Sequence, residues 1–166
     1  MLIAGCSLQA QKGTQDSKKS CRQFAQSFYN WYLANAFNHH IAPWHVALKY
    51  KGNPFSNELT QALIESDAEA KREGDPVLDF DPILNTQDRA DRYVVRSVTR
   101  KNGDYWANVY GIWSTPVSGV GEGSQVVAEL IFKNGRWLFV NFHYPNNTSP
   151  DNENLLSILR YQYHPK

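Results

Sequence analysis

Residues 125–144, QVVAELIFKNGRWLFVNFHY, decide the fold class of this chain. Two runs rich in β-branched and aromatic residues flank Asn134-Gly135. Both central residues of a two-residue hairpin turn need a positive φ, which Asn and Gly adopt at the lowest cost. The stretch therefore predicts an antiparallel β-hairpin.

A second hairpin is predicted upstream of the first. Residues 93–99 (YVVRSVT) are β-branched and partly alternate, and Lys101-Asn102-Gly103-Asp104 supplies a turn before a return strand over residues 105–113. A glycine-rich connection over residues 116–123 leads to the strand that begins at Gln125. The second half of the chain is therefore predicted to be an antiparallel meander.

The first half of the chain shows helical patterns. From residue 16 or 17, apolar residues recur at three- and four-residue spacings, which predicts a long amphipathic helix; they are Cys21, Phe24, Ala25, Phe28, Trp31, Tyr32 and Ala36. Residues 38–54 contain helix breakers and predict a loop or a short irregular helix. Ser56 is a good N-cap for a second helix that runs to about Arg72 and stops at Gly74.

These patterns together predict an α+β domain. A short C-terminal helix is expected around residues 155–159, where Leu and Ile recur. The order of elements places the long N-terminal helix and the second helix against a curved antiparallel sheet. With 166 residues and 42% hydrophobic residues, one domain over residues 20–166 is expected, preceded by residues 1–19.

The N-terminus resembles a bacterial lipobox. Small residues precede a cysteine in Ile3-Ala4-Gly5-Cys6, and this resemblance implies a lipid anchor on Cys6 and a place in the bacterial periplasm or the membrane-anchored cell envelope. The basic and apolar regions of a signal peptide do not precede it, so residues 1–19 are interpreted as a truncated signal followed by a polar tether over residues 9–20. The alternative is a frayed cytoplasmic N-terminus. A disulfide between Cys6 and Cys21 is possible only if Cys6 is not lipidated.

Charge and cysteine content exclude several classes of partner. The net charge of +1 gives no field that would attract nucleic acid or anionic lipid across the whole chain, so membrane contact is expected only through the anchor on Cys6. No CxxC pair is present, which excludes the common zinc sites, and Cys21 is expected to be a small buried hydrophobe. No cofactor motif is present either, so no metal or cofactor is predicted.

Residues 77–88, VLDFDPILNTQD, are the richest candidate for chemistry and allow three interpretations. An EF-hand is excluded because Pro82 lies in the loop and glycine is missing, which leaves only a looser cation site. Asp79 and Asp81 could lie on one face of an extended segment and act as an acid–base pair. The best-supported interpretation is a docked turn that Asp81-Pro82 opens and that Asn85 and Asp88 cap.

The histidines offer one further candidate. His39, His40 and His45 could form a metal cluster, although a solvated loop is the stronger expectation. His143 ends the last predicted strand, where it could bind a ligand or relay a proton at the mouth of a cavity. The simpler expectation for His143 is a bond to a backbone carbonyl.

Three segments together resemble one known family: FYNWYL at residues 28–33, LDFDPILNTQD at residues 78–88, and GRW followed by VNFHY at residues 135–144. They are similar to a bacterial family of domains of unknown function within the nuclear-transport-factor-2-like (cystatin-like) superfamily, which includes small envelope lipoproteins. The resemblance implies a cone of curved antiparallel sheet around helices, with a cavity that some relatives use for catalysis and others for binding. It carries no catalytic position over to this chain, and fold alone does not decide function.

Three functions follow as hypotheses. The first is a non-enzymatic envelope domain that binds a small molecule, peptide or protein, either as a monomer or as a homodimer. Its candidate ligand-binding residues are Tyr29, Trp31, Trp113, Trp137 and His143. The second is a cavity enzyme, a hydrolase or isomerase, that uses Asp79 or Asp81 with His143 or a tyrosine such as Tyr29. The third is an immunity-type protein that inhibits a toxin through an exposed patch.

Overall fold

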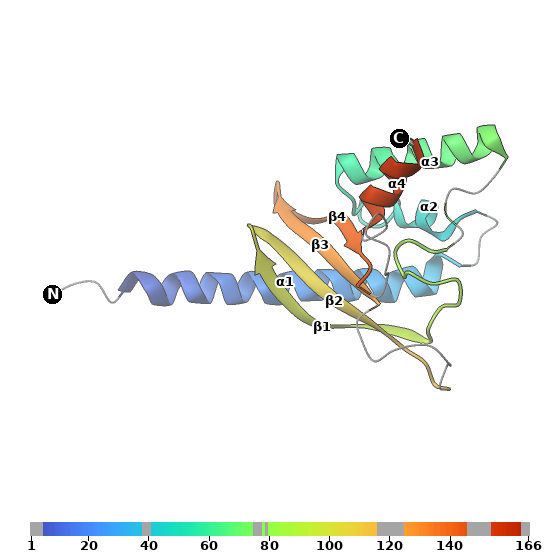
Figure 1. The fold of residues 1–166 in the computed structure, drawn as a ribbon. Coiled ribbons are helices and arrows are strands. Elements are labelled where there is room, and N and C mark those ends of the chain that lie inside the picture. The colour runs from blue at the N-terminus through green and yellow to red at the C-terminus, as the bar shows by residue number, and fades with distance from the viewer. Residues whose placement is uncertain are drawn as a thin grey trace.

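The computed structural model of the chain describes residues 5–37, 41–74, 78, 80–115, 125–145 and 154–163. Within these ranges the chain forms four helices and one open, four-stranded antiparallel sheet with strand order β1-β2-β3-β4 (Figure 1). The elements are α1 (Gly5–Asn35), α2 (Pro43–Ala47), α3 (Asn57–Glu73), β1 (Arg92–Lys101), β2 (Asp104–Ile112), β3 (Val126–Lys133), β4 (Arg136–His143) and α4 (Leu155–Tyr163). The predicted α+β class and the predicted meander are confirmed. None of the described helices is long and apolar enough to span a membrane.

The helix α1 begins well before the predicted start at residue 16 or 17. It runs from Gly5, so the predicted helix start at residue 16 or 17 is wrong. Periodicity marks only the part of a helix that packs, whereas the polar segment over residues 9–20 contains three Gln and three Lys residues, which extend an existing helix at little cost. Figure 1 shows this N-terminal part of α1 extending beyond the sheet. Ser20 already belongs to the domain, because the indole Nε1 of Trp137 donates a hydrogen bond to its hydroxyl at 3.0 Å.

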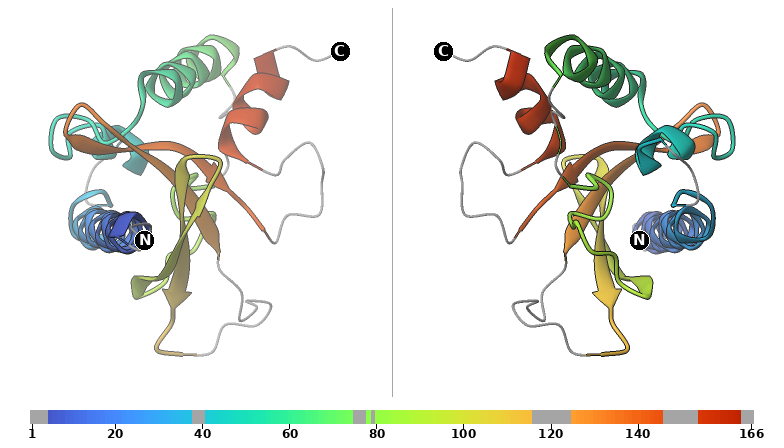
Figure 2. Two further views of the ribbon diagram at one scale, coloured as in Figure 1. Left: turned by 90° about the vertical axis from the view of Figure 1, so that its left-hand side faces the viewer. Right: turned by 90° about the vertical axis from the view of Figure 1, so that its right-hand side faces the viewer.

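Both predicted Asn-Gly turns are present. Asn102 and Gly103 have φ values of 55° and 96°, and Asn134 and Gly135 have values of 52° and 77°, as the tightest hairpin turns require. The register of β1 and β2 shifts at a bulge between Val95 and Ser97. Bulges and twist bend a sheet, and the view along α1 in Figure 2 shows β1 and β2 passing beside α1 while β4 crosses above it.

The interior of this bend is filled with aromatic side chains. Phe28 of α1 is completely buried, and its ring lies 4.7 Å from the ring of Phe139 on β4 and 5.6 Å from that of Tyr32. Cys21, on the same helix, is also fully buried, and burial raises the pKa of its thiol to about 12, as expected for an unreactive core cysteine. The space between α1 and the sheet is therefore a packed core.

Side chains of α1 also complete the free edge of the sheet. Gln26 accepts a hydrogen bond from the amide of Val95 at 2.8 Å and donates one to the carbonyl of Tyr93 at 2.9 Å. Arg22 donates from Nε to the carbonyl of Val95 at 2.8 Å. These bonds satisfy backbone groups that an edge strand would otherwise expose, and they fix α1 along β1.

The helix α3 has the predicted ends. The Ser56 hydroxyl accepts a hydrogen bond from the amide of Leu59 at 3.2 Å, and Gly74 ends the helix in the left-handed conformation with a φ of 80°. The residues before α3 pair with β4 through the amide of Ser56 and the carbonyl of Phe139 at 2.8 Å. Figure 2 shows α3 and α4 on the side of β4 opposite α1.

Candidate functional site

The segment between α3 and β1 is a docked turn centred on Asp81. Its backbone closes through the amide of Asp81 and the carbonyl of Thr86 at 3.0 Å. The Asp81 carboxylate oxygen Oδ1 accepts hydrogen bonds from the amides of Ile83 and Leu84 at 2.9 and 3.0 Å. Both of these apolar side chains are fully buried. The interpretation as a docked turn is thus supported, with Asp81 rather than Asn85 or Asp88 as the main cap.

Three tyrosine hydroxyls donate hydrogen bonds to the turn from the side of the core. The hydroxyl of Tyr29 donates to the carbonyl of Ile83 at 3.3 Å, and that of Tyr144 donates to the carbonyl of Pro82 at 2.7 Å. The hydroxyl of Tyr32 donates to Oδ2 of Asp81 at 2.8 Å. The aromatic face of α1 and the end of β4 therefore place the Asp81 carboxyl group at a fixed position.

The Asp81 carboxyl group has an unusual environment. Burial raises its pKa from 3.8 to about 6, although the bonds from Tyr32 and from the amides of Leu84 and Ile83 act in the opposite direction. Burial, and after it the nearby charge of Asp81, raises the pKa of the Tyr32 hydroxyl well above its usual value. At neutral pH the site therefore holds a carboxylate beside a hydroxyl that keeps its proton.

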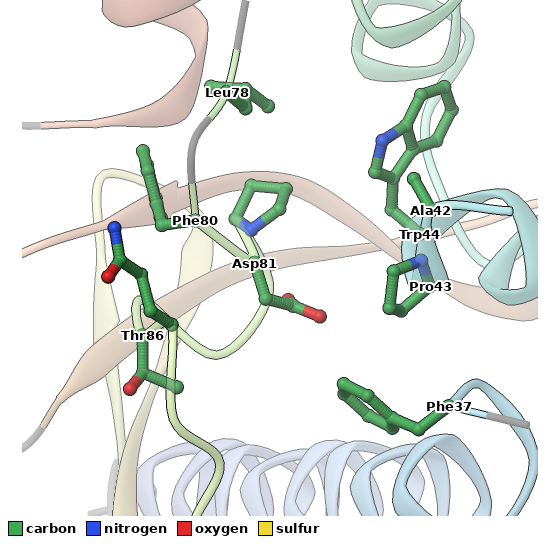
Figure 3. A pocket seen from close by; sticks show the side chains of 10 residues that line it. Phe37, Ala42, Pro43, Trp44, Leu78, Phe80, Asp81 and Thr86 are labelled. Carbon is green, nitrogen blue, oxygen red and sulfur yellow. The ribbon is translucent and has the colours of Figure 1, made fainter. Parts of the chain in front are cut away.

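A cavity of about 510 Å³ lies next to this carboxyl group. Its walls come from Phe37, shortly after α1, from the start of α2 and from the turn, and Figure 3 shows the Asp81 carboxylate pointing into the space between them. The lining residues are Phe37, Ala42, Pro43, Trp44, Leu78, Phe80, Asp81, Pro82, Thr86 and Gln87. The walls are mostly apolar, and Asp81 is the one ionisable group among these lining residues.

The residues predicted to bind a ligand do not line this cavity. Tyr29 is fully buried in the core. Trp31 is partly buried with its ring 5.0 Å from that of Tyr50, and Trp113 lies over Gly111 at the end of β2. Trp137 is nearly buried, with its ring 4.9 Å from that of Tyr105. The structure distributes these aromatic side chains over the core and its rim.

His143 lies on the other side of the sheet from Asp81. Phe142 and Tyr144 point into the core, so His143 between them points away from it. Its Nε2 lies 2.8 Å from a carboxylate oxygen of Glu129, and its ring stacks on Trp106 with centroids 4.3 Å apart. The predicted pairing of Asp81 with His143 is therefore not formed, because the alternation of side chains along β4 separates the two groups.

Most of the other candidates lie outside the part of the chain that the structure describes. Asp79, His39 and His40 lie outside the described residues, as does the side chain of Cys6. His45 lies 3.3 Å from a carboxylate oxygen of Asp67 on α3. Among the described residues, no group of three or more acidic, histidine or cysteine side chains could hold a metal ion.

Sequence reasoning found Asp81 but missed its partners. Phe37, Pro43 and Trp44 lie in segments without a periodic pattern, and the sequence marks Tyr32 only as one residue of an apolar helix face. Aromatic residues do lie on both sides of the break between α1 and α2, but this pattern does not specify which residues come into contact.

Comparisons of this chain with protein-family models, with curated proteins and with solved structures found no match.

Proposed function

We propose that this protein is a non-enzymatic binding domain whose cavity at Asp81 takes a small molecule, or a side chain of a peptide, with a positively charged head and an apolar body. The observation that carries the proposal is a partly buried carboxylate at the edge of a cavity with apolar and aromatic walls. A binding site of this kind fixes a ligand through one polar group and selects it by shape elsewhere.

The hydrogen bonds of Asp81 leave one position for a ligand. Oδ1 accepts two amide bonds and Oδ2 accepts the bond from Tyr32, so Oδ2 retains one acceptor position. Among the described residues, no Lys, Arg or His forms an ion pair with Asp81. A cationic donor from a ligand would supply the missing opposite charge, and charge-assisted hydrogen bonds are the stronger kind.

The walls suit the same class of ligand. Phe37, Trp44 and Phe80 supply aromatic surface, which attracts organic cations as well as apolar groups. The Phe37 ring already interacts with a cation of the protein itself, because the guanidinium of Arg89 lies 4.9 Å from its centroid. The volume of about 510 Å³ falls within the range of roughly 300–1,000 Å³ that small-molecule sites occupy.

Catalysis by Asp81 with His143 has less support than binding. A hydrolase or isomerase of the predicted kind needs a second acid–base group within hydrogen-bond reach. His143 faces the opposite side of the sheet, and the raised pKa of Tyr32 keeps its hydroxyl protonated. The geometry around Asp81 supports a fixed recognition group.

The cellular setting and the family are part of the same proposal. The lipobox-like Ile3-Ala4-Gly5-Cys6 supports a lipid-anchored domain in the bacterial envelope. A long helix held in the bend of an antiparallel meander supports the nuclear-transport-factor-2-like resemblance. In that setting the cavity would bind amines or basic peptides that are present outside the cytoplasm.

The proposal is tested by titrating the protein with benzylammonium and, as the uncharged comparison, with benzyl alcohol. Binding is followed by calorimetry and by the amide NMR shifts of the turn. Asp81→Asn should lower the affinity for benzylammonium at least tenfold and leave the affinity for benzyl alcohol unchanged. The matched control is Asp88→Asn, which makes the same chemical change at an exposed position outside the cavity.

The pH dependence of binding gives a second readout. Affinity for benzylammonium should rise with pH through about 6, because Asp81 ionises there. Equal affinity of the wild-type protein and Asp81→Asn would overturn the proposal. So would equal affinity for the ammonium and the alcohol, or no binding of either probe.

A further inference from the structure

A second cavity, distant from Asp81, lies between α1 and the free edge of β1. It has a volume of about 450 Å³ and is lined by Lys18, Lys19, Arg22, Arg96, Ser97 and Val98. Four of these six residues are cationic and none is acidic. We propose that this basic groove binds a phosphate group, independently of the function proposed for the Asp81 cavity.

The positive charges of the groove are not neutralised by neighbouring carboxylates. Within the described part of the chain, no ion pair involves any of the four cations. Asp16, the acidic residue of α1, is exposed and forms no ion pair with them. Because the whole chain has a net charge of only +1, this groove is a local concentration of charge and not a sample of a basic surface.

Two of the cationic side chains are held in place. Arg22 uses its Nε for the carbonyl of Val95, which leaves its terminal amino groups for a ligand. The guanidinium of Arg96 lies 4.2 Å from the centroid of the Tyr110 ring. Arg96 is also the residue at the bulge of β1, where the strand departs from regular pairing. Cations that are ordered in advance lose less entropy when an anion binds.

The groove offers one neutral donor beside the charges. The Ser97 hydroxyl accepts a hydrogen bond from the side-chain amide of Asn108 at 3.0 Å, so its own proton is free to point at a ligand. Guanidinium, ammonium and hydroxyl donors on one concave surface match the oxygens of a phosphate, which Arg binds in a bidentate manner. A carboxylate presents fewer oxygens and would use fewer of these donors.

The phosphate can belong to a lipid headgroup or to a soluble molecule, and the experiment separates these two sources. The full, unlipidated chain is titrated with inorganic phosphate at constant ionic strength while the amide shifts of Ser97 and Val98 are followed. In a second arm, it is mixed with vesicles of phosphatidylcholine alone or with added phosphatidylglycerol, and the bound fraction is measured by sedimentation.

The test variant is Lys19→Gln/Arg96→Gln, because neither side chain bonds to the backbone in the described structure. The control for net charge is Lys71→Gln/Arg72→Gln, which also removes one lysine and one arginine charge, but from α3, where Asp67 and Glu69 pair with them. The test variant should bind inorganic phosphate or phosphatidylglycerol vesicles at least tenfold more weakly than the wild-type chain does, whereas the control variant should bind them unchanged. The two variants should have equal melting temperatures.

Each outcome has a defined meaning. A response to inorganic phosphate that the test variant loses supports the site with a soluble ligand, and binding confined to phosphatidylglycerol vesicles supports it with a lipid headgroup. Absence of binding in both arms would overturn the proposal. An equal loss in the Lys71→Gln/Arg72→Gln control would also overturn it, because net charge rather than the groove would then explain the binding.

Discussion

Replacement of Asp81 by asparagine should make the protein more stable above pH 6, although the side chain is hydrogen-bonded and mostly enclosed. The amide oxygen of Asn can still accept the bonds from Ile83 and Leu84, so the turn keeps its cap. The hydroxyl of Tyr32 can rotate and accept a bond from the new amide nitrogen. The change therefore removes a buried charge and preserves the contacts around it.

The magnitude follows from the pKa of Asp81. Burial raises this pKa from 3.8 to about 6, so the folded protein binds the proton more tightly than the unfolded chain does. The stability from this group is fully present below pH 3.8 and is lost as the pH rises through 6. A change of about two pH units in pKa corresponds to about 3 kcal/mol. Part of the residue is solvent-exposed, which makes this value an upper bound.

The assay is urea unfolding of the wild-type protein and Asp81→Asn at intervals from pH 4 to pH 8. The difference in free energy of unfolding should grow in favour of the variant by up to about 3 kcal/mol, mostly between pH 4 and pH 6, and should then level off. Asp88→Asn, at an exposed position, should show a flat difference. A flat difference for Asp81→Asn, or one that favours the wild-type protein as pH rises, would refute the reasoning.

Three further predictions concern the same site, the core and the C-terminal end of α3. Tyr32→Phe removes a bond that lowers the pKa of Asp81, so this pKa should rise above about 6 in an NMR titration of the carboxyl carbon; an unchanged value would contradict the assignment. Phe28→Ala should lower the free energy of unfolding by about 3–5 kcal/mol in urea, whereas Phe132→Ala, at a side chain that is 59% exposed, should change it by less than about 0.5 kcal/mol. Gly74→Ala should cost about 1 kcal/mol in thermal unfolding because of its φ of 80°, and since no atom lies within 4 Å of the new methyl group, a larger loss would point to a steric cause.

Local features of the fold were predictable because neighbouring residues specify them. The hairpin turns at Asn102 and Asn134 depend on the φ preferences of two consecutive residues. The ends of α3 depend on the hydroxyl of Ser56 and the missing side chain of Gly74. The start of α1 was not predictable, since apolar periodicity ends where packing ends while the polar helix continues to Gly5.

The candidate site was predictable only in part. Asp81 could be singled out, because an aspartate before proline between buried apolar residues indicates a docked turn. Its bond to Tyr32 joins residues 49 positions apart, and no local pattern encodes that distance. The pairing of Asp81 with His143 is not formed for a related reason. Alternation predicts that His143 and Tyr144 point to opposite faces of the sheet, but which face meets α1 depends on packing.

The sequence by itself determined the succession of helices and strands, their turns and their caps, because these depend on backbone preferences and hydrogen bonds within a few residues. Only the tertiary structure decided which polar groups became functional candidates. The carboxyl group of Asp81 becomes buried, and four cationic side chains come together between α1 and β1, when distant segments pack against each other. Desolvation and charge density act through space. A carboxylate therefore acquires a raised pKa, and separate cationic side chains form one anion-binding groove, only once the chain has folded.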